Sequence, residues 1–195
     1  MVKVILASGN QGKCAELSAS LPASFQLVTQ GEMGIESIPE TGATFIENAL
    51  LKARHAATVS GLPALADDSG IMVKALDGRP GIHSARFAGP GATDAENLAK
   101  LLHELQGTSG DRAASFYCCL VFMRSQADQA PLVAEGWWHG VVLDKPRGAG
   151  GFGYDPLFLP DGMESSAAEL DAEVKQRHSH RGQALRLLAA KLAAL

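Results

Sequence analysis

A polar segment rich in glycine follows the first apolar run of the chain and could bind phosphate. This segment, Ser8-Gly9-Asn10-Gln11-Gly12-Lys13, stands where a strand should lead into a helix. Bare backbone amides, a helix N-terminus and a lysine side chain together favour a phosphate group. The spacing differs from a Walker A loop, because Gly9 is too close to Gly12 and Cys14 replaces the hydroxyl that would bind magnesium. A phosphate loop and a plain turn with a solvated lysine both remain open.

A second polar segment, Asp67-Asp68-Ser69-Gly70, follows the apolar residues Ala64–Ala66. Neighbouring side chains of a strand point to opposite faces, so at most one of the two carboxylates should face a given cleft. One carboxylate beside a hydroxyl suits Mg²⁺, or a base that deprotonates water. The alternative is a solvated turn between Ala64–Ala66 and a second strand at Ile71–Val73.

Two further acids lie at the start of a predicted helix. Glu47 stands three residues after Thr44, as a capping box requires, and this local role is sufficient to explain it. Glu40, in Glu40-Thr41-Gly42, has no such local partner. A functional carboxylate and a solvated loop residue are equally compatible with Glu40.

Cationic and titratable side chains gather just before the predicted last helix: Lys175, His178, His180 and Arg181. The positive end of the helix dipole disfavours unpaired positive charge there, so an anionic partner is expected. A metal site at His178 and His180 is not favoured, because residues two apart on a helix face different directions.

Aromatic residues form two short clusters. Phe152-Gly153-Tyr154-Asp155 could stack a flat base and offer it a carboxylate acceptor, although packing of both rings in the core is the alternative. Trp137 and Trp138 are adjacent and cannot share one face of a strand. One of the two indoles should pack inside, and the other should lie near a surface or interface.

Apolar spacing predicts the elements that carry these motifs. Strands are predicted at Val2–Ala7, Ser115–Met123 and Leu132–Leu143, the last two adjacent and antiparallel. Helices are predicted at Lys13–Leu21, at about residues 44–60, from near Asp94 to Gly107 with Thr93 and Glu96 as a second capping box, and at the C-terminus around Leu185, Leu188, Leu192 and Leu195. This order predicts an α/β protein with a mixed sheet.

Composition limits the class of protein. The 195 residues, 46% hydrophobic and 19% charged, predict a soluble globular protein of one domain or two closely joined lobes, and exclude disorder. A net charge of −4 argues against a broad basic face for a nucleic acid polymer. Three cysteines without zinc-site spacing indicate a reducing cytoplasm. The apolar runs are too short for a signal peptide or a membrane span.

Six fragments in order resemble the inosine triphosphate pyrophosphatase family, in its bacterial RdgB/HAM1-like branch. They are Ser8-Gly9-Asn10 with Lys13, Glu40-Thr41-Gly42 leading to Phe45-Ile46-Glu47-Asn48-Ala49, Asp67-Asp68-Ser69-Gly70, Pro80-Gly81-Ile82 with Ser84-Ala85-Arg86, Phe152-Gly153-Tyr154-Asp155-Pro156, and Ser179-His180-Arg181. The resemblance spans nearly the whole chain. It implies a magnesium-dependent, homodimeric enzyme that hydrolyses ITP, dITP and XTP to the monophosphate and pyrophosphate. It also implies a long curved mixed sheet with flanking helices, forming two lobes around a substrate cleft.

The resemblance also implies roles for individual residues. Asp68 would be the proton acceptor, and Glu40 and Asp68 would hold Mg²⁺. The substrate-binding residues would be Ser8, Gly9, Asn10, Gln11, Gly12 and Lys13 at the triphosphate, Ser69, the base pocket Phe152, Gly153, Tyr154 and Asp155, and Lys175, His180 and Arg181 closing over the nucleotide. This sequence departs from many relatives at Val174 and His178. A pyrophosphatase for other nucleotides and a non-hydrolytic purine nucleotide sensor are the alternative functions.

Overall fold

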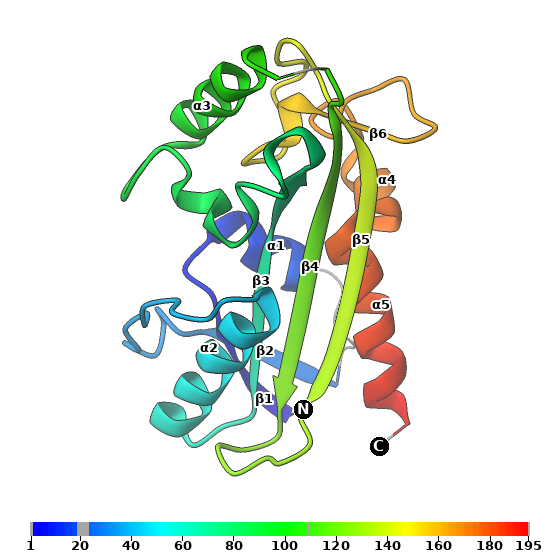
Figure 1. Cartoon of the computed structure of the whole chain (residues 1–195). Coiled ribbons are helices and arrows are strands. Elements are labelled where there is room, and N and C mark those ends of the chain that lie inside the picture. The colour runs from blue at the N-terminus through cyan, green and yellow to red at the C-terminus, as the bar shows by residue number, and fades with distance from the viewer. Residues whose placement is uncertain (1, 19–23, 109, 195) are drawn as a thin grey trace. The chain divides into compact units, whose positions relative to one another are not determined.

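The computed structural model describes residues 2–18, 24–108 and 110–194 and contains a six-stranded mixed sheet (Figure 1). The strands are β1 (Val2–Ala7), β2 (Phe25–Thr29), β3 (Ala64–Val73), β4 (Ala113–Met123), β5 (Leu132–Val142) and β6 (Phe158–Pro160), in the order β2-β1-β3-β4-β5-β6. Strand β1 pairs in parallel with β2 and β3, whereas β5 and β6 are antiparallel. The predicted α/β class and mixed sheet are therefore confirmed.

The predicted helices form near their expected positions, and a further helix that the sequence did not indicate covers Ala172–His178. They are α1 (Gln11–Ser18), α2 (Phe45–Ser60), α3 (Asp94–Gln106), α4 (Ala172–His178) and α5 (His180–Ala193), with short 3₁₀ helices at Lys74–Leu76, Gly81–Arg86 and Asp155–Leu157. Both predicted capping boxes form, at Thr44 with Glu47 and at Thr93 with Glu96. The predicted positions Leu21 and Leu195 lie outside the described residues. No helix in the described part of the chain has the length and apolar character needed to span a bilayer.

The chain forms two compact units. The first comprises Met1–Asp68, Cys118–Gly136 and Arg181–Leu195. In this unit, one face of the strands packs against α1 and α5 in an apolar cluster of Val4, Leu6, Leu17, Leu65, Cys118, Leu120, Phe122, Ala134, Ala184, Leu185 and Leu188. Helix α2 contacts β1 and buries a face that contains several alanines. The alternation of β1 and β3 thus supplies two faces, each covered by helices.

The second unit comprises Ser69–Tyr117 and Trp137–His180. Its apolar cluster includes Ile71, Val73, Leu101, Leu105, Phe116, Trp138, Tyr154, Leu157 and Phe158. The Phe116 ring packs edge-on against Phe158, with ring centroids 4.7 Å apart. Trp138 is buried in this cluster and Trp137 is 44% exposed, as the rule of alternating faces predicts.

The predicted turn at Asp67–Gly70 is wrong, because β3 continues from Ala64 to Val73 without interruption. Glycine at position 70 allows the backbone at Gly81 to approach the strand closely. A Cβ atom at Gly70 would lie 2.3 Å from the Gly81 carbonyl oxygen and 2.4 Å from Ser84 Oγ. The Ile71 amide donates to Ser84 Oγ at 3.0 Å, so the strand just after Gly70 is held by a hydrogen bond inside the second unit.

We expect Gly70→Ala to lower the free energy of unfolding by about 2 kcal/mol, because the added methyl group must displace backbone and a hydrogen-bonded hydroxyl. Urea denaturation measures this change. The matched control is Gly107→Ala, where no atom lies within 4 Å of an added Cβ and φ is −90°. Equal denaturation midpoints for the two variants would contradict the packing argument.

Candidate functional site

The polar segment after β1 forms an ordered turn that leads into α1. Ser8 Oγ accepts a hydrogen bond from the Asn10 amide at 3.3 Å, and Asn10 Oδ1 accepts one from the Lys13 amide at 3.0 Å. The Cys14 thiol donates to the Ser8 carbonyl oxygen at 3.6 Å. Asn10 therefore supports the first turn of α1 with its side chain, as short polar residues do at helix starts. These local bonds shape the backbone of the turn independently of the Lys13 ammonium.

A pocket of about 550 Å³ lies in the second unit, where Met72, Trp137 and His139 are among its lining residues. The loop borders its own pocket of about 480 Å³. That pocket is lined by Ser8, Gly9, Gln11, Cys14, Thr29, Gln30, Gly31, Ile35 and Ser37. Its lining is rich in hydroxyl, amide and backbone groups, which suit a hydrogen-bonding ligand.

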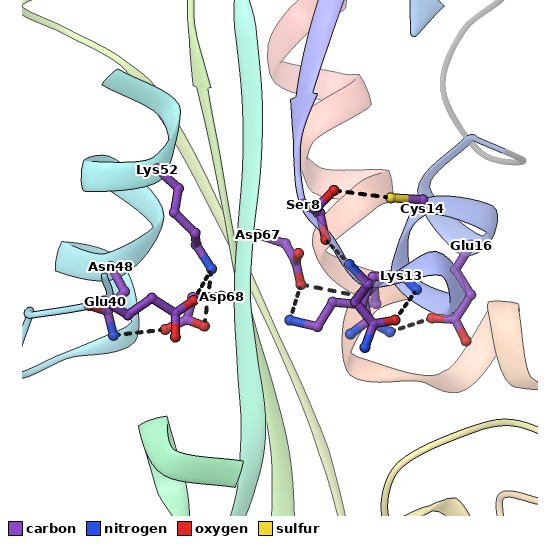
Figure 2. A network of polar contacts seen from close by, with 11 residues as sticks. Ser8, Lys13, Cys14, Glu16, Glu40, Asn48, Lys52, Asp67 and Asp68 are labelled. Carbon is purple, nitrogen blue, oxygen red and sulfur yellow. Dashed lines mark hydrogen bonds and ion pairs between the residues drawn. The ribbon is translucent and has the colours of Figure 1, made fainter. Parts of the chain in front are cut away.

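Strand β3 brings two carboxylates to the level of this loop. The pairing of β1 with β3 sets Ala7 opposite Ala66, so Asp67 and Asp68 follow beside Ser8. Figure 2 shows Asp67 and Asp68 leaving β3 on opposite sides. Ligands of α/β proteins gather at the carboxyl ends of parallel strands; the loop lies at that end of β1, and the two carboxylates lie beside it in the middle of β3.

The Asp68 side of β3 carries a network from α2 and the segment before it. Asn48 Nδ2 donates to Asp68 Oδ2 at 3.1 Å, and Asn48 Oδ1 accepts from the Gly42 amide at 2.8 Å. The Lys52 ammonium lies 2.6 Å from Glu40 Oε1 and 3.4 Å from Asp68 Oδ1 (Figure 2). The two candidate metal ligands, Glu40 and Asp68, thus converge on one cation.

Sequence reasoning assigned no role to Asn48 or Lys52. A usable signal was present, because the two residues are four apart on α2 and so share a helix face. That face is otherwise made of buried alanines, so a lysine on it needs an anionic partner. Glu47, by contrast, accepts from the amides of Ala43 and Thr44, which is the capping role that the sequence indicated.

Burial and neighbouring charges set the ionisation of this group. Burial raises the pKa of Asp68 above its ordinary value, and Lys52 and Lys13 oppose that rise. Burial acts to lower the pKa of Lys52, but the charges of Asp67, Asp68 and Glu40 outweigh burial and raise it. A carboxylate with a raised pKa beside a cation is suited to accept a proton nearer neutral pH.

The Glu40 and Asp68 pair fits the ligand requirements of Mg²⁺. Mg²⁺ is usually held by one or two carboxylates, with waters and substrate phosphates completing the shell. Two convergent carboxylates meet that requirement. No group of three or more His, Cys, Asp or Glu ligands occurs among residues 2–18, 24–108 and 110–194, so a cage built wholly from protein is not present in that part of the chain.

The opposite side of β3 carries a second ionic group. Asp67 Oδ2 lies 2.9 Å from the Lys13 ammonium and 3.8 Å from Arg181 Nε, and Arg181 also pairs with Glu16. Arg181 is in the first turn of α5, where the sequence analysis expected an anionic partner for the cations. The structure supplies carboxylates from α1 and β3 for this purpose.

The candidate base pocket in the second unit is a tight turn around one carboxylate. Asp155 Oδ2 accepts the Phe152 amide at 2.9 Å and the Lys175 ammonium at 2.7 Å. The Lys175 Nζ atom also lies 4.9 Å from the centroid of the Phe152 ring. Gly151 has φ of 71°, and a Cβ atom there would lie 2.1 Å from the same carboxylate. Asp155 therefore joins the turn to the cation of α4.

The remaining predicted site residues have varied surroundings. The His180 ring is buried and stacks on Phe116, with centroids 4.7 Å apart and planes 6° apart. The Tyr154 hydroxyl donates to the Ser84 carbonyl oxygen at 2.8 Å, and burial raises its pKa. Ser69 is half-buried in β3, and His178 is exposed at the end of α4. Tyr154 thus has the core role that the sequence analysis left open.

The profile of the Ham1 family matches residues 4–191. The chain belongs to the Ham1 family. This Ham1 chain is 55% identical over 195 residues to a dITP/XTP pyrophosphatase of Methylococcus capsulatus, covering 99% of the chain and 97% of that protein. It is 56% identical over 191 residues to the dITP/XTP pyrophosphatase of Yersinia pestis, with 96% of each covered.

Solved structures agree with the Ham1 fold. A HAM1 protein from Coxiella burnetii superposes with a TM-score of 0.93 at 46% identity and full coverage of both chains. The Ham1 protein of Staphylococcus aureus gives a TM-score of 0.87 at 37% identity, with 98% of each chain covered. The family resemblance stated from the six sequence fragments is therefore confirmed.

We expect Lys52→Met to lower the free energy of unfolding at pH 7 by about 3 kcal/mol, because Glu40 and Asp68 then lack their shared cation.

Asp68→Asn should not lower the free energy of unfolding. The raised pKa of Asp68 means that ionisation opposes folding, so this residue's contribution to stability decreases as pH rises through its folded-state pKa. Urea denaturation of wild type, both single variants and the double variant measures the coupling. Additive effects would contradict the proposed interaction.

Proposed function

We propose that this Ham1 chain hydrolyses the non-canonical purine nucleoside triphosphates ITP, dITP and XTP to the monophosphate and pyrophosphate. The observation that carries the proposal is the convergence of Glu40 and Asp68 on the Lys52 ammonium, at the level of the loop that leads to Lys13. The names of relatives at 55–56% identity support the substrate class. The reaction removes deaminated purines from the nucleotide pool.

In the phosphate half of the site, we assign triphosphate binding to the turn from Ser8 to Lys13. The Lys13 ammonium and the exposed amides of the turn neutralise and orient the phosphate chain. Ser69 is assigned as a further substrate contact. Glu40 and Asp68 would hold Mg²⁺, which when bound supplies positive charge to the phosphate oxygens and the leaving pyrophosphate.

Asp68 is assigned as the base. Its carboxylate accepts a proton from a water whose oxygen forms a new bond to phosphorus at the α–β linkage, while the bridging P–O bond breaks and its electrons leave with pyrophosphate. Asn48 holds the Asp68 carboxylate by a hydrogen bond and so orients it toward that water. The Lys52 ammonium keeps the carboxylates of Glu40 and Asp68 together before substrate binds.

The base pocket is assigned to Phe152, Gly153, Tyr154 and Asp155, and closure over the nucleotide to Lys175, His180 and Arg181. Hypoxanthine and xanthine carry an N1 hydrogen and a 6-oxo group, whereas adenine presents an N1 acceptor and a 6-amino donor. Leaving a buried polar group unpaired costs about 1–3 kcal/mol, which discriminates between these edges. Because Asp155 already accepts the Phe152 amide and Lys175, we assign it chiefly to ordering this pocket.

We expect magnesium-dependent release of pyrophosphate from ITP, dITP and XTP, with far slower turnover of ATP and GTP. General-base assistance is worth about 10²- to 10⁴-fold, so Asp68→Asn should remain folded and lose at least about a hundredfold in kcat. Separate assays of pyrophosphate and orthophosphate identify the bond that is cleaved. Saturable ITP binding without any turnover would favour the nucleotide sensor instead, and near-normal turnover of Asp68→Asn would place the base elsewhere.

We also propose that the protein acts in the cytoplasm as a homodimer. Among the described residues, Cys14, Cys118 and Cys119 form no disulfide, which agrees with a reducing compartment. A candidate dimer surface is the outer face of β5, where the exposed Trp137 ring packs against Tyr117 and His139, with centroids 4.6 and 6.0 Å away. Exposed indoles of this kind are typical of interfaces.

We expect Trp137→Ala to shift the sedimentation coefficient from that of a dimer to that of a monomer, because it removes the largest apolar side chain of this face. The control is Leu187→Ala, which removes an exposed apolar side chain from α5 in the other unit. A dimer that persists in Trp137→Ala would move the interface to another surface. A monomeric wild type would exclude the dimer.

A further inference from the structure

The Asp67 carboxylate has no part in the chemistry assigned above, yet it is almost completely buried beside the phosphate loop. Only 1% of the residue is exposed. Taking a carboxylate out of water is unfavourable unless cations and hydrogen bonds replace the lost hydration. An apolar residue at this position of β3 would need no cation beside it. The burial of a carboxylate here therefore suggests that its ion pairs have a role.

The backbone and the side chain of Lys13 are held by different partners. The Lys13 amide donates to Asn10 Oδ1 at 3.0 Å, whereas the ammonium pairs with Asp67 Oδ2 at 2.9 Å. A lysine side chain is a flexible stem with a point charge at its end, so the backbone alone does not place the ammonium. Asp67 supplies the missing constraint (Figure 2).

The same carboxylate also faces the cation of α5. Arg181 Nε lies 3.8 Å from Asp67 Oδ2, and the Arg181 side chain pairs with Glu16. The charges of this group balance, with Lys13 and Arg181 opposite Asp67 and Glu16. The Asp67 carboxylate therefore lies within ion-pair distance of two cations.

We propose that Asp67 is a positioning residue that holds the Lys13 ammonium in place for the triphosphate from the side of β3 opposite Asp68. This inference rests on the proposed function, because it assigns Lys13 to phosphate. An ammonium group has three N–H donors, so Lys13 can bind a phosphate oxygen while it still donates to Asp67. Asp67 thus orders the side chain of Lys13 without contacting the substrate.

The test is the substitution Asp67→Asn, which preserves shape and removes charge. The triphosphate is charged in both the ground state and the transition state, so loss of an ordered Lys13 should weaken both equally. We expect KM for dITP to rise about tenfold, the effect of one charge-assisted hydrogen bond, with kcat within about threefold of wild type.

Coupling to Lys13 separates positioning from general damage. In the background of Lys13→Met, which itself raises KM, Asp67→Asn should change KM by less than about twofold, because the group that it positions is gone. An undiminished effect in that background would overturn the proposal. So would an unchanged KM in the single variant, or a loss confined to kcat.

Asp128→Asn is the matched structural control. Asp128 is also a buried carboxylate of the first unit, and its oxygens accept from Arg124 at 2.8 and 2.6 Å, in the loop between β4 and β5. This variant should lower the urea midpoint and leave KM unchanged. If Asp128→Asn raised KM as much as Asp67→Asn, the Asp67 effect would be one of stability alone, and the proposal would fail.

A binding measurement distinguishes this inference from the proposed function. Calorimetric titration of the same variants with inorganic tripolyphosphate should show about tenfold weaker binding in Asp67→Asn and no further loss beside Lys13→Met. A wild type that does not hydrolyse dITP but gives this binding pattern would reject the function and retain the inference. Normal hydrolysis by the wild type, with KM and tripolyphosphate binding unchanged in Asp67→Asn, would retain the function and reject the inference.

If Asp67→Asn does not fold, Asp67→Glu, which displaces the carboxylate by one methylene, is measured against the same criteria.

Discussion

Alternation of side chains along β3 is the constraint on which the phosphate half of the site depends. Asp67 and Asp68 are neighbours in sequence but leave the strand on opposite faces. Each face is covered by a different helix, so each carboxylate meets a different cation, Lys13 on one side and Lys52 on the other. One dipeptide therefore supplies two separate ionic groups, and only one of them can reach a given metal ion or water.

These ionic groups fix the positions of side chains and contribute little to the stability of the fold. A buried ion pair gains little over an apolar packing of the same volume, because desolvation offsets most of the attraction. Breaking such a pair is costly, which restricts the side chains to one arrangement. Lys175 and Asp155 show the same principle in the second unit, where a cation of α4 and the turn at Phe152 share one carboxylate. Each of these ionic groups is thus ordered before a ligand arrives.

Local features of the fold were predictable because they depend on neighbours in sequence. The capping boxes at Thr44 and Thr93 formed as expected, since a side chain needs only its own helix turn to make those bonds. The opposite orientation of the two aspartates followed from strand geometry. The turn predicted at Asp67–Gly70 failed because polar composition normally indicates solvent, whereas here each carboxylate is neutralised by a residue far away in sequence.

The sequence by itself determined the secondary-structure order, the mixed α/β class and the family, because periodicity and ordered motifs are carried by the chain without reference to its folding in space. Only the tertiary structure decided that Lys52 pairs with both Glu40 and Asp68, that Asn48 donates a hydrogen bond to Asp68, and that Asp67 pairs with Lys13. These contacts join residues that are 12 to 54 positions apart in the sequence. Which charges meet depends on how helices cover the two faces of the sheet, and that arrangement arises only when the apolar clusters pack.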